Sequence, residues 1–421
     1  MSVKRAKRKE SVTCRAPVNI AVVKYWGKRD EELILPINSS ISATLHIDHM
    51  CATTTVAASR DFTKDRIWLN GKEESFDNPR LQSVLKAIRE RAADNEGNSH
   101  LTDCHLHICS KNNFPTAAGL ASSAAGYACL VSALSKLFNI QGNVTDIARI
   151  GSGSACRSLD GGFVQWIMGE KDSGVDSIGE QIVDEDYWPE MRVLILVVSG
   201  KKKPVGSSQG MLRSVQTSPF LKYRAEVVVP EYMQRMLAAI KNKDFLAFAE
   251  ITMKESNQLH AVCQDTYPPI SYMNDTSWSI VRLVHAYNNF KGAVKMTGFG
   301  LIVPIEVSVI FGDWVEVAYT FDAGPNAALY LQEENVTEVL SFMSHFFPPG
   351  DDQDVKSFFK GLPCNTCQVS EDLLNAVSPM ETKPGAVKYI IHTKPGPGAQ
   401  EVSDEGASLL DENGLPKELA S

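Results

Sequence analysis

Two lysines lie four residues apart in the segment 18–29 (VNIAVVKYWGKR), directly after an apolar run typical of a strand. Lys24 and Lys28 are joined there by Arg29. Several cations are needed to balance the charges of a diphosphate, and charge-assisted hydrogen bonds to phosphate oxygens are strong. This spacing indicates an anion site. The alternative is an ordinary solvated strand end, which is the more frequent meaning of such a segment when it stands alone.

A second segment, 115–126 (PTAAGLASSAAG), is a run of small residues at the start of a helix predicted over 117–138. Small side chains let backbone N–H groups approach phosphate oxygens, and a helix N-terminus attracts anions. Ser122 and Ser123 would add hydroxyl donors. The segment is not a Walker A loop, which needs a lysine after its last glycine. A phosphate-binding loop and a helix kept narrow for close packing fit its composition equally well.

Two further segments each present one charged side chain among small or turn-forming residues. Arg157 in 152–158 (SGSACRS) would suit a bidentate contact to a carboxylate, and a tight turn is the alternative. Asp322 in 317–327 (VAYTFDAGPNA) follows an apolar strand and could orient a substrate hydroxyl for attack on phosphorus. Its alternative is a turn-stabilising aspartate.

The polar run at 201–209, with three lysines and two serines, either reaches substrate or lies on the surface.

Two cysteine-containing segments favour structural roles. The segment 104–109 (CHLHIC) alternates as a strand does, with both histidines on one face, and a zinc site is the less favoured interpretation. Cys364 and Cys367 form a single CxxC without a partner pair. We therefore predict no protein-built metal site.

Composition limits the possible functions. Lysine and arginine number 42 against 50 acidic residues, giving a net charge of −8, so a general attraction to nucleic acid is excluded. Nine scattered cysteines and the lack of a secretory signal favour the reducing cytosol. The run 117–134 is rich in Ala, Ser and Gly and is a poor membrane span. The basic run at 4–9 is typical of a solvated tail.

Hydrophobic periodicity predicts a mixture of strands and helices. The expected strands are 19–23, 33–45, 105–108, 163–168, 193–198, 317–321 and 387–392, and the expected helices are 84–93, 117–138, 229–240, 244–259 and 280–288.

These segments in this order, together with SNQLHAVCQDTYPPISYMNDTSW at 256–278, resemble the mevalonate-diphosphate decarboxylase family of the GHMP kinase superfamily over about residues 12–402. The resemblance implies an α+β fold. Its first domain would resemble domain 2 of ribosomal protein S5, and its second would be ferredoxin-like. We expect a flexible basic tail at 1–11, an ATP-binding domain at 12–195, a second domain at 196–402 and a loose tail at 403–421. A homodimer is also implied.

The resemblance further implies that (R)-5-diphosphomevalonate is converted to isopentenyl diphosphate with ATP as co-substrate and Mg²⁺. The implied catalytic residues are Asp322, Lys24, Arg157 and Ser122. The implied substrate contacts are Asn19, Tyr25, Trp26, Gly27, Lys28, Arg80, Ser152, Gly153, Ser154, Ala155, Cys156, Arg157 and Ser208. The implied nucleotide contacts are Pro115, Ala117, Ala118, Gly119, Leu120, Ala121, Ser122 and Ser123.

The chain departs from the family pattern in two places. About twenty residues, assigned to 296–316, are inserted before the strand that leads to Asp322. This apolar, β-prone segment is either a looped-out excursion or a splicing artefact, and it would abolish catalysis if it displaced the strand. The second departure is Asp160, which stands where the family has a bulky aromatic residue and could pair with Arg157.

Two alternative functions follow from the same residues. A small-molecule kinase of the superfamily would phosphorylate without decarboxylating, and the motif FDAGPNA favours the decarboxylase over it. The insertion keeps a catalytically inactive binding isoform in consideration.

Overall fold

The structure is a computed structural model that describes residues 9–93, 100–101, 103–114, 122–200, 203–298, 314–351 and 353–419. Among the described helices, none combines the length and the apolar character needed to cross a lipid bilayer.

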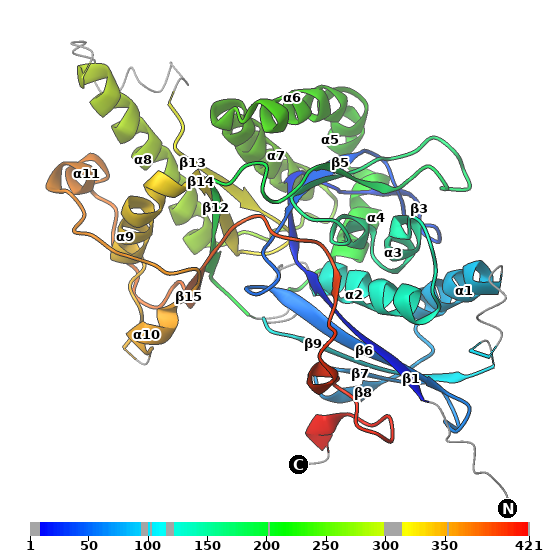
Figure 1. The fold of residues 1–421 in the computed structure, drawn as a ribbon. Helices are drawn as coiled ribbons and strands as arrows, with labels where there is room; N and C mark the ends of the chain where they lie inside the picture. The colour runs from blue at the N-terminus through cyan, green and yellow to red at the C-terminus, as the bar shows by residue number, and fades with distance from the viewer. Residues whose placement is uncertain are drawn as a thin grey trace, which may run out of the picture.

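The first half of the chain is built on a six-stranded sheet covered by helices on one face (Figure 1). All neighbouring strands are antiparallel except β7 and β9, which are parallel. In spatial order the strands are β17 (Gln400–Glu401), β1 (Glu10–Pro17), β6 (Cys51–Ser59), β9 (His105–Asn112), β7 (Arg66–Leu69) and β8 (Lys72–Glu74). The predicted strand over 105–108 is therefore confirmed as part of β9.

Helix α2 (Ser122–Leu137) packs across β1 and β6. Its buried face consists largely of small residues such as Ala125, Ala128 and Ala133, which allow the helix to lie close to the sheet. The remaining helices of this half are α1 (Pro79–Ala93), α3 (Thr145–Gly151) and the 3₁₀ turn η2 (Gly153–Arg157). A four-stranded sheet follows the order β11 (Gly179–Val183), β10 (Phe163–Trp166), β5 (Ser40–Thr44) and β2 (Asn19–Val23), and β3 (Lys28–Asp30) pairs with β4 (Leu35–Pro36).

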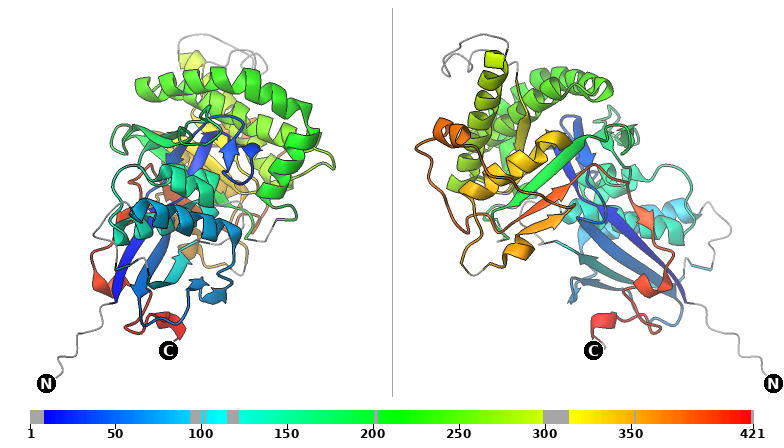
Figure 2. Two further views of the ribbon diagram at one scale, coloured as in Figure 1. Left: turned by 90° about the vertical axis from the view of Figure 1, so that its right-hand side faces the viewer. Right: turned by 60° about the vertical axis from the view of Figure 1, so that its left-hand side comes forward.

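The second half contains a five-stranded sheet whose central strand is buried along its whole length. Its order is β13 (Val317–Phe321), β14 (Ala327–Gln332), β12 (Met191–Val197), β16 (Tyr389–Thr393) and β15 (Phe359–Gly361). The accompanying helices are α4 (Ser207–Thr217), α5 (Pro219–Tyr223), the π-helical turn η3 (Arg224–Val228), α6 (Val229–Asn242), α7 (Phe245–Asp265), α8 (Asp275–Gly298), α9 (Val336–Phe346), α10 (Val355–Phe358) and α11 (Glu371–Ala376). Figure 2 shows α6 and α7 in green at the opposite end of the molecule from the blue six-stranded sheet.

The structure differs from the predicted domain limits at two points. The predicted boundary between 195 and 196 falls inside β12, which is the middle strand of the second sheet. The predicted tail at 1–11 is also too long. Glu10 and Ser11 already belong to β1, where they pair with Ala58 and Ala57, while residues 1–8 lie outside the described part.

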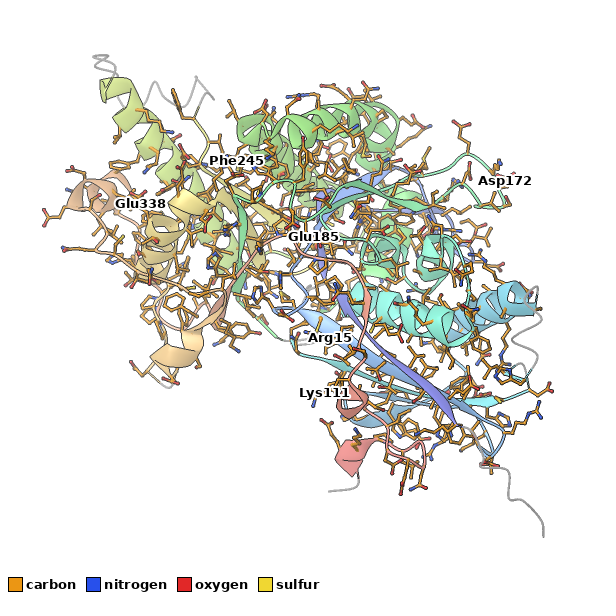
Figure 3. All side chains as sticks on the ribbon, in the orientation of Figure 1. Arg15, Lys111, Asp172, Glu185, Phe245 and Glu338 are labelled. Carbon is orange, nitrogen blue, oxygen red and sulfur yellow. The ribbon has the colours of Figure 1, made fainter. Side chains whose placement is uncertain are left out.

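The C-terminal segment 403–419 is docked on the first domain, in contrast to the loose tail predicted for 403–421. Leu410 is buried with Trp68 and Cys109 on the outer face of the six-stranded sheet. The Leu409 N–H donates to the Thr55 hydroxyl at 2.9 Å. Lys111, labelled in Figure 3, forms an ion pair with Glu418. The Gly-, Ser- and acid-rich composition suggested looseness, but two adjacent leucines are enough to anchor the segment.

The predicted insertion at 296–316 lies mostly outside the described residues, which stop at 298 and resume at 314. Its two ends meet, because Lys295 forms an ion pair with Glu316 and lies 4.8 Å from the centre of the Trp314 ring. The Asn288 side chain accepts from the Val317 N–H and donates to the Val317 carbonyl. Strand β13 therefore begins in register with β14 and is not displaced.

Candidate active site

A cavity of about 360 Å³ lies between the two halves of the molecule. The ends of β2 and β13, the first turn of α2, the turn η2 and the start of α4 all contribute to its wall. The sequence-predicted residues that line it are Asn19, Lys24, Tyr25, Trp26, Lys28, Arg80, Ser122, Ser123, Ser152, Gly153, Ser154, Arg157, Ser208 and Asp322.

Three predicted site residues in the described part of the chain do not line the cavity. Gly27 has a positive φ of 98°, and a Cβ at this position would lie 2.7 Å from the Ile37 side chain, so its role is conformational. Ala155 and Cys156 are fully buried behind the cavity wall. The predicted nucleotide contacts Pro115 and Ala117 to Ala121 lie outside the described residues.

Lys24 and Asp322 form the central ion pair of the cavity. Lys24 directly follows β2, Asp322 directly follows β13, and the Lys24 Nζ lies 2.5 Å from Asp322 Oδ1. Only 1% of Lys24 is exposed, and burial lowers its pKa, while Asp322 and Glu255 act in the opposite direction. The side chain of Asp322 is 27% exposed, toward the cavity that it lines. A buried cation beside a more accessible carboxylate is an arrangement that can accept a proton and hold an anion.

Arg157 is fixed by neutral hydroxyl and amide oxygens. Its guanidinium donates to Ser40, to Ser42 at 2.9 Å, to Ser154 at 3.2 Å and to Asn19 at 3.4 Å. Burial lowers its pKa. A guanidinium held by neutral partners keeps its charge for an incoming anion.

The hypothesis that Asp160 pairs with Arg157 is wrong. In the described part of the chain these two side chains form no ion pair, and the Asp160 carbonyl instead accepts from the Thr44 hydroxyl. Burial raises the pKa of Asp160.

Further polar residues also line the cavity. Lys28 forms an ion pair with Glu31 at 2.5 Å. Arg80, from α1, donates to the Ser208 hydroxyl of α4 at 2.9 Å, which links the two halves across the cavity. The Tyr25 ring packs edge-on against Trp166, and burial raises the pKa of the Tyr25 hydroxyl.

Comparisons with known proteins identify the family. A model described as the diphosphomevalonate decarboxylase-like N-terminal domain matches residues 16–179, and the mevalonate 5-diphosphate decarboxylase C-terminal domain matches 193–298 and 308–402. The diphosphomevalonate decarboxylase of Danio rerio is 54% identical over 98% of both chains. The corresponding human protein is 51% identical and covers 97% of this chain and 98% of its own. This chain belongs to the diphosphomevalonate decarboxylase family.

Solved structures agree with this assignment. Mevalonate diphosphate decarboxylase from Trypanosoma brucei superimposes with a TM-score of 0.81 at 37% identity, covering 96% of this chain and 100% of the other. A complex of MDDEF with MVAPP, AMPPCP and magnesium has a TM-score of 0.68 at 27% identity, with 94% and 100% coverage. The predicted α+β fold of the GHMP kinase type is therefore confirmed. The chain is an enzyme, a decarboxylase of the carbon–carbon lyase class, and the rival kinase interpretation is set aside.

Lys203 is a site residue of this decarboxylase that the sequence left undecided. It was one of three lysines in the polar run at 201–209, and nothing in the run distinguished it. Its Nζ donates to the Ser207 hydroxyl at 2.6 Å and to the Ala323 carbonyl at 3.1 Å, beside Asp322. Burial lowers its pKa.

A second cavity, of about 790 Å³, adjoins the first. It lies between β7, β8 and the start of α2, and Ser122 and Ser123 line both cavities. Tyr127 and Asn78 belong to its wall. Two cavities that share the first turn of a helix can place two anionic ligands end to end at that turn.

Proposed function

We propose that the chain catalyses the ATP-dependent decarboxylation and dehydration of (R)-5-diphosphomevalonate to isopentenyl diphosphate, with release of ADP, phosphate and CO₂. The observation that carries this proposal is the meeting of Lys24, Asp322 and Arg157 in one cavity. A carboxylate that can take a proton and an arginine that can hold a carboxylate are the two groups that the reaction requires.

Asp322 acts on the C3 hydroxyl of the substrate. Its Oδ1 accepts from Lys24, and its Oδ2 takes the hydroxyl proton as the oxygen attacks the γ-phosphorus of ATP. The new phosphorus–oxygen bond forms as the bond to ADP breaks. Lys24 donates to the Asp322 carboxylate and balances negative charge on the transferring phosphoryl group. The phosphorylated oxygen is then a good leaving group.

Arg157 acts on the carboxylate. When phosphate leaves C3, the electrons of the carbon–carbon bond to the carboxylate form the double bond and CO₂ departs. Arg157 has to orient the carboxylate without stabilising it more than the transition state. Its four neutral partners hold the guanidinium at one place, and a fixed position is what orientation needs.

The diphosphate is held by Lys28 and Arg80, with hydroxyl donors from Ser208 and Tyr25. Arg80 and Ser208 already contact each other from opposite halves of the chain. A diphosphate that binds both would hold the cavity closed.

The second cavity is assigned to ATP, and Ser122 and Ser123 to its phosphates. One neighbouring structure contains AMPPCP and magnesium. No cluster of three or more acidic, histidine or cysteine side chains suited to a metal occurs in the described residues. Mg²⁺ binds mainly to water and substrate phosphates, and Ser122 would supply a protein oxygen. Bound there, the ion would neutralise phosphate charge.

We further propose that the enzyme is a homodimer of the cytosol. Sedimentation at micromolar concentration should then give about twice the 46.2 kDa chain mass, and cell fractionation should place the enzyme in the soluble extract. A single-chain mass or a membrane pellet would contradict the respective proposal.

The decisive experiment measures ADP and CO₂ together from the enzyme with ATP, Mg²⁺ and the substrate. We expect equal amounts, with both abolished in Asp322→Ala. The matched control is Asp404→Ala, which removes an exposed turn carboxylate that accepts from the Gly406 N–H. ADP without CO₂ would show a kinase, and neither product from a folded protein would show an inactive isoform.

A further inference from the structure

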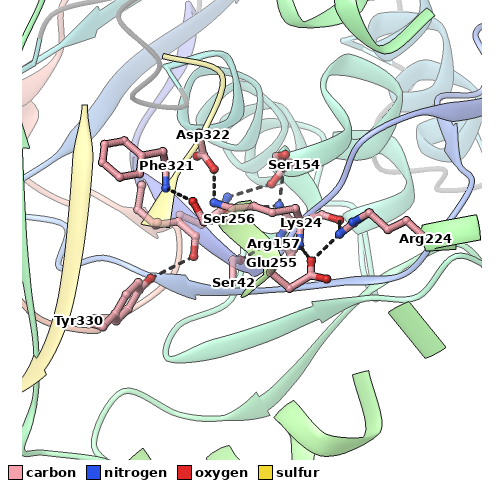
Figure 4. A network of polar contacts seen from close by, with 12 residues as sticks. Lys24, Ser42, Ser154, Arg157, Arg224, Glu255, Ser256, Phe321, Asp322 and Tyr330 are labelled. Carbon is pink, nitrogen blue, oxygen red and sulfur yellow. Dashed lines mark hydrogen bonds and ion pairs between the residues drawn. The ribbon is translucent and has the colours of Figure 1, made fainter. Parts of the chain in front are cut away.

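Lys24 is held through its main chain by residues far away in the sequence (Figure 4). Its N–H donates to Glu255 Oε2 of α7 at 2.7 Å. Its carbonyl accepts from the Arg224 guanidinium and from the Asn38 amide, each at 3.1 Å. Glu255 and Arg224 also form an ion pair with each other. One buried ion pair therefore binds both polar groups of the Lys24 backbone.

The peptide that leads to Asp322 is held in the same way. The Phe321 N–H donates to the Ser256 hydroxyl at 2.9 Å, and the His260 ring packs edge-on against the Phe321 ring, with the two ring centres 6.3 Å apart. Ser256 and His260 are four residues apart and share one face of α7. β13 is the edge strand of its sheet, so the Ser256 hydroxyl accepts the hydrogen bond that a neighbouring strand would otherwise take from the Phe321 N–H.

We infer that α7 is the positioning element of the active site: Glu255, with Arg224, fixes Lys24, while Ser256 and His260 fix Asp322. Glu255 and Ser256 are neighbours in the sequence, so one turn of one helix sets the separation of two residues that come from different halves of the chain. This inference rests on the roles proposed above for Lys24 and Asp322. Neither Glu255 nor Arg224 lines the cavity, and both act through the residues that they hold.

Burial and charge support this assignment. Glu255 is fully buried, and a buried ion pair is costly to dehydrate, so its main value lies in geometry. Arg224 begins the π-helical turn η3, and such turns occur frequently at functional sites. Burial lowers the pKa of His260 to about 4, so it packs against Phe321 as a neutral ring and adds no further cation beside Lys24 and Arg157.

The test is Glu255→Gln, which keeps an oxygen for the Lys24 N–H but removes the charge that holds Arg224. We expect kcat to fall about tenfold to a hundredfold, because small displacements of reacting groups cost this much. The KM for diphosphomevalonate should stay within about twofold, since the substrate contacts are intact. The matched control is Glu250→Gln, an exposed carboxylate on the same helix paired with Lys254 and Arg235, and it should match the wild type.

The pH profile separates positioning from general damage. Burial and Arg157 lower the Lys24 pKa, and Glu255 and Asp322 raise it. Removing the Glu255 charge should therefore move the alkaline limb of kcat to lower pH. The inference would be overturned if Glu255→Gln left the alkaline limb of the kcat–pH profile unchanged, left kcat itself unchanged, or raised KM with a normal kcat.

If Glu255→Gln does not fold, as judged by circular dichroism, Ser256→Ala carries the test, because it removes a single hydrogen bond. It should lower kcat and leave KM unchanged, and wild-type kcat would overturn the inference. Asp322→Ala is measured in parallel. An inactive Asp322→Ala with a fully active Glu255→Gln refutes only the positioning role, whereas an active Asp322→Ala refutes the proposed function itself.

Discussion

Replacement of Arg157 tests how the carboxylate of the substrate is held. In Arg157→Gln the fixed positive charge is lost, although a polar amide remains at this position. A hydrogen bond to a charged group is worth about 1.5–3 kcal/mol, so a bidentate contact is worth about 3–6 kcal/mol. At about 1.4 kcal/mol for each factor of ten, kcat/KM should fall by roughly 10² to 10⁴. Arg157→Lys keeps the charge but not the planar pair of donors. Its kcat/KM should therefore fall by roughly the square root of the factor expected for Arg157→Gln.

The assay follows CO₂ release under steady state for both variants. Arg149 supplies a matched control, because it is also buried but donates to the Leu33 and Gly174 carbonyls, away from the cavity. Arg149→Lys should lower the melting temperature without changing KM. If Arg157→Gln retained more than a tenth of wild-type kcat/KM, or if Arg149→Lys lost as much, the carboxylate role of Arg157 would be refuted.

Three further predictions concern the C-terminal segment and the metal. Leu410→Ala should lower the free energy of unfolding by about 2–3 kcal/mol in urea titration, because it removes a buried anchor, and an unchanged midpoint would show that the segment is not docked. His107 hydrogen-bonds to the Gly414 carbonyl, and burial lowers its pKa. Because the unfolded chain then binds more protons than the folded one, the free energy of unfolding should fall as the pH drops below about 6.5. His107→Gln should flatten this dependence. Chelation of Mg²⁺ should abolish turnover and leave the melting temperature of the ligand-free enzyme unchanged. A lower melting temperature would instead indicate a structural metal.

The sequence predicted the reacting residues better than the residues that position them. Lys24, Arg157 and Asp322 stand in short segments whose composition suggests chemistry, and the family resemblance assigned their roles. Glu255 lies 231 residues from Lys24, and no local pattern relates a buried carboxylate in a helix to a distant backbone N–H. Such partners depend on tertiary packing, which periodicity does not specify.

Domain limits were predicted less well for a related physical reason. An apolar strand such as β12 is buried on both faces, so its composition does not tell which sheet it joins. The C-terminal segment has a composition typical of loose tails, and its docking depends on Leu409 and Leu410 meeting an apolar patch contributed by β6, β7 and β9. Sequence composition describes a segment in isolation, whereas docking depends on the surface opposite to it.

The charges of the active site explain how a chain with a net charge of −8 binds highly anionic ligands. Lys24, Arg157 and Lys203 lie around one carboxylate, that of Asp322, and burial lowers the pKa of all three cations. Keeping these groups charged without a ligand costs free energy, and an anionic substrate offsets that cost. At alkaline pH the unliganded lysines begin to lose protons and must take them up again when diphosphomevalonate or ATP binds, so the stabilisation of the fold by these ligands should decrease with pH, whereas that by a neutral ligand should not. A thermal-shift series from pH 7 to 9 would measure this difference, and a pH-independent shift would mean that the buried cations remain fully charged without ligand.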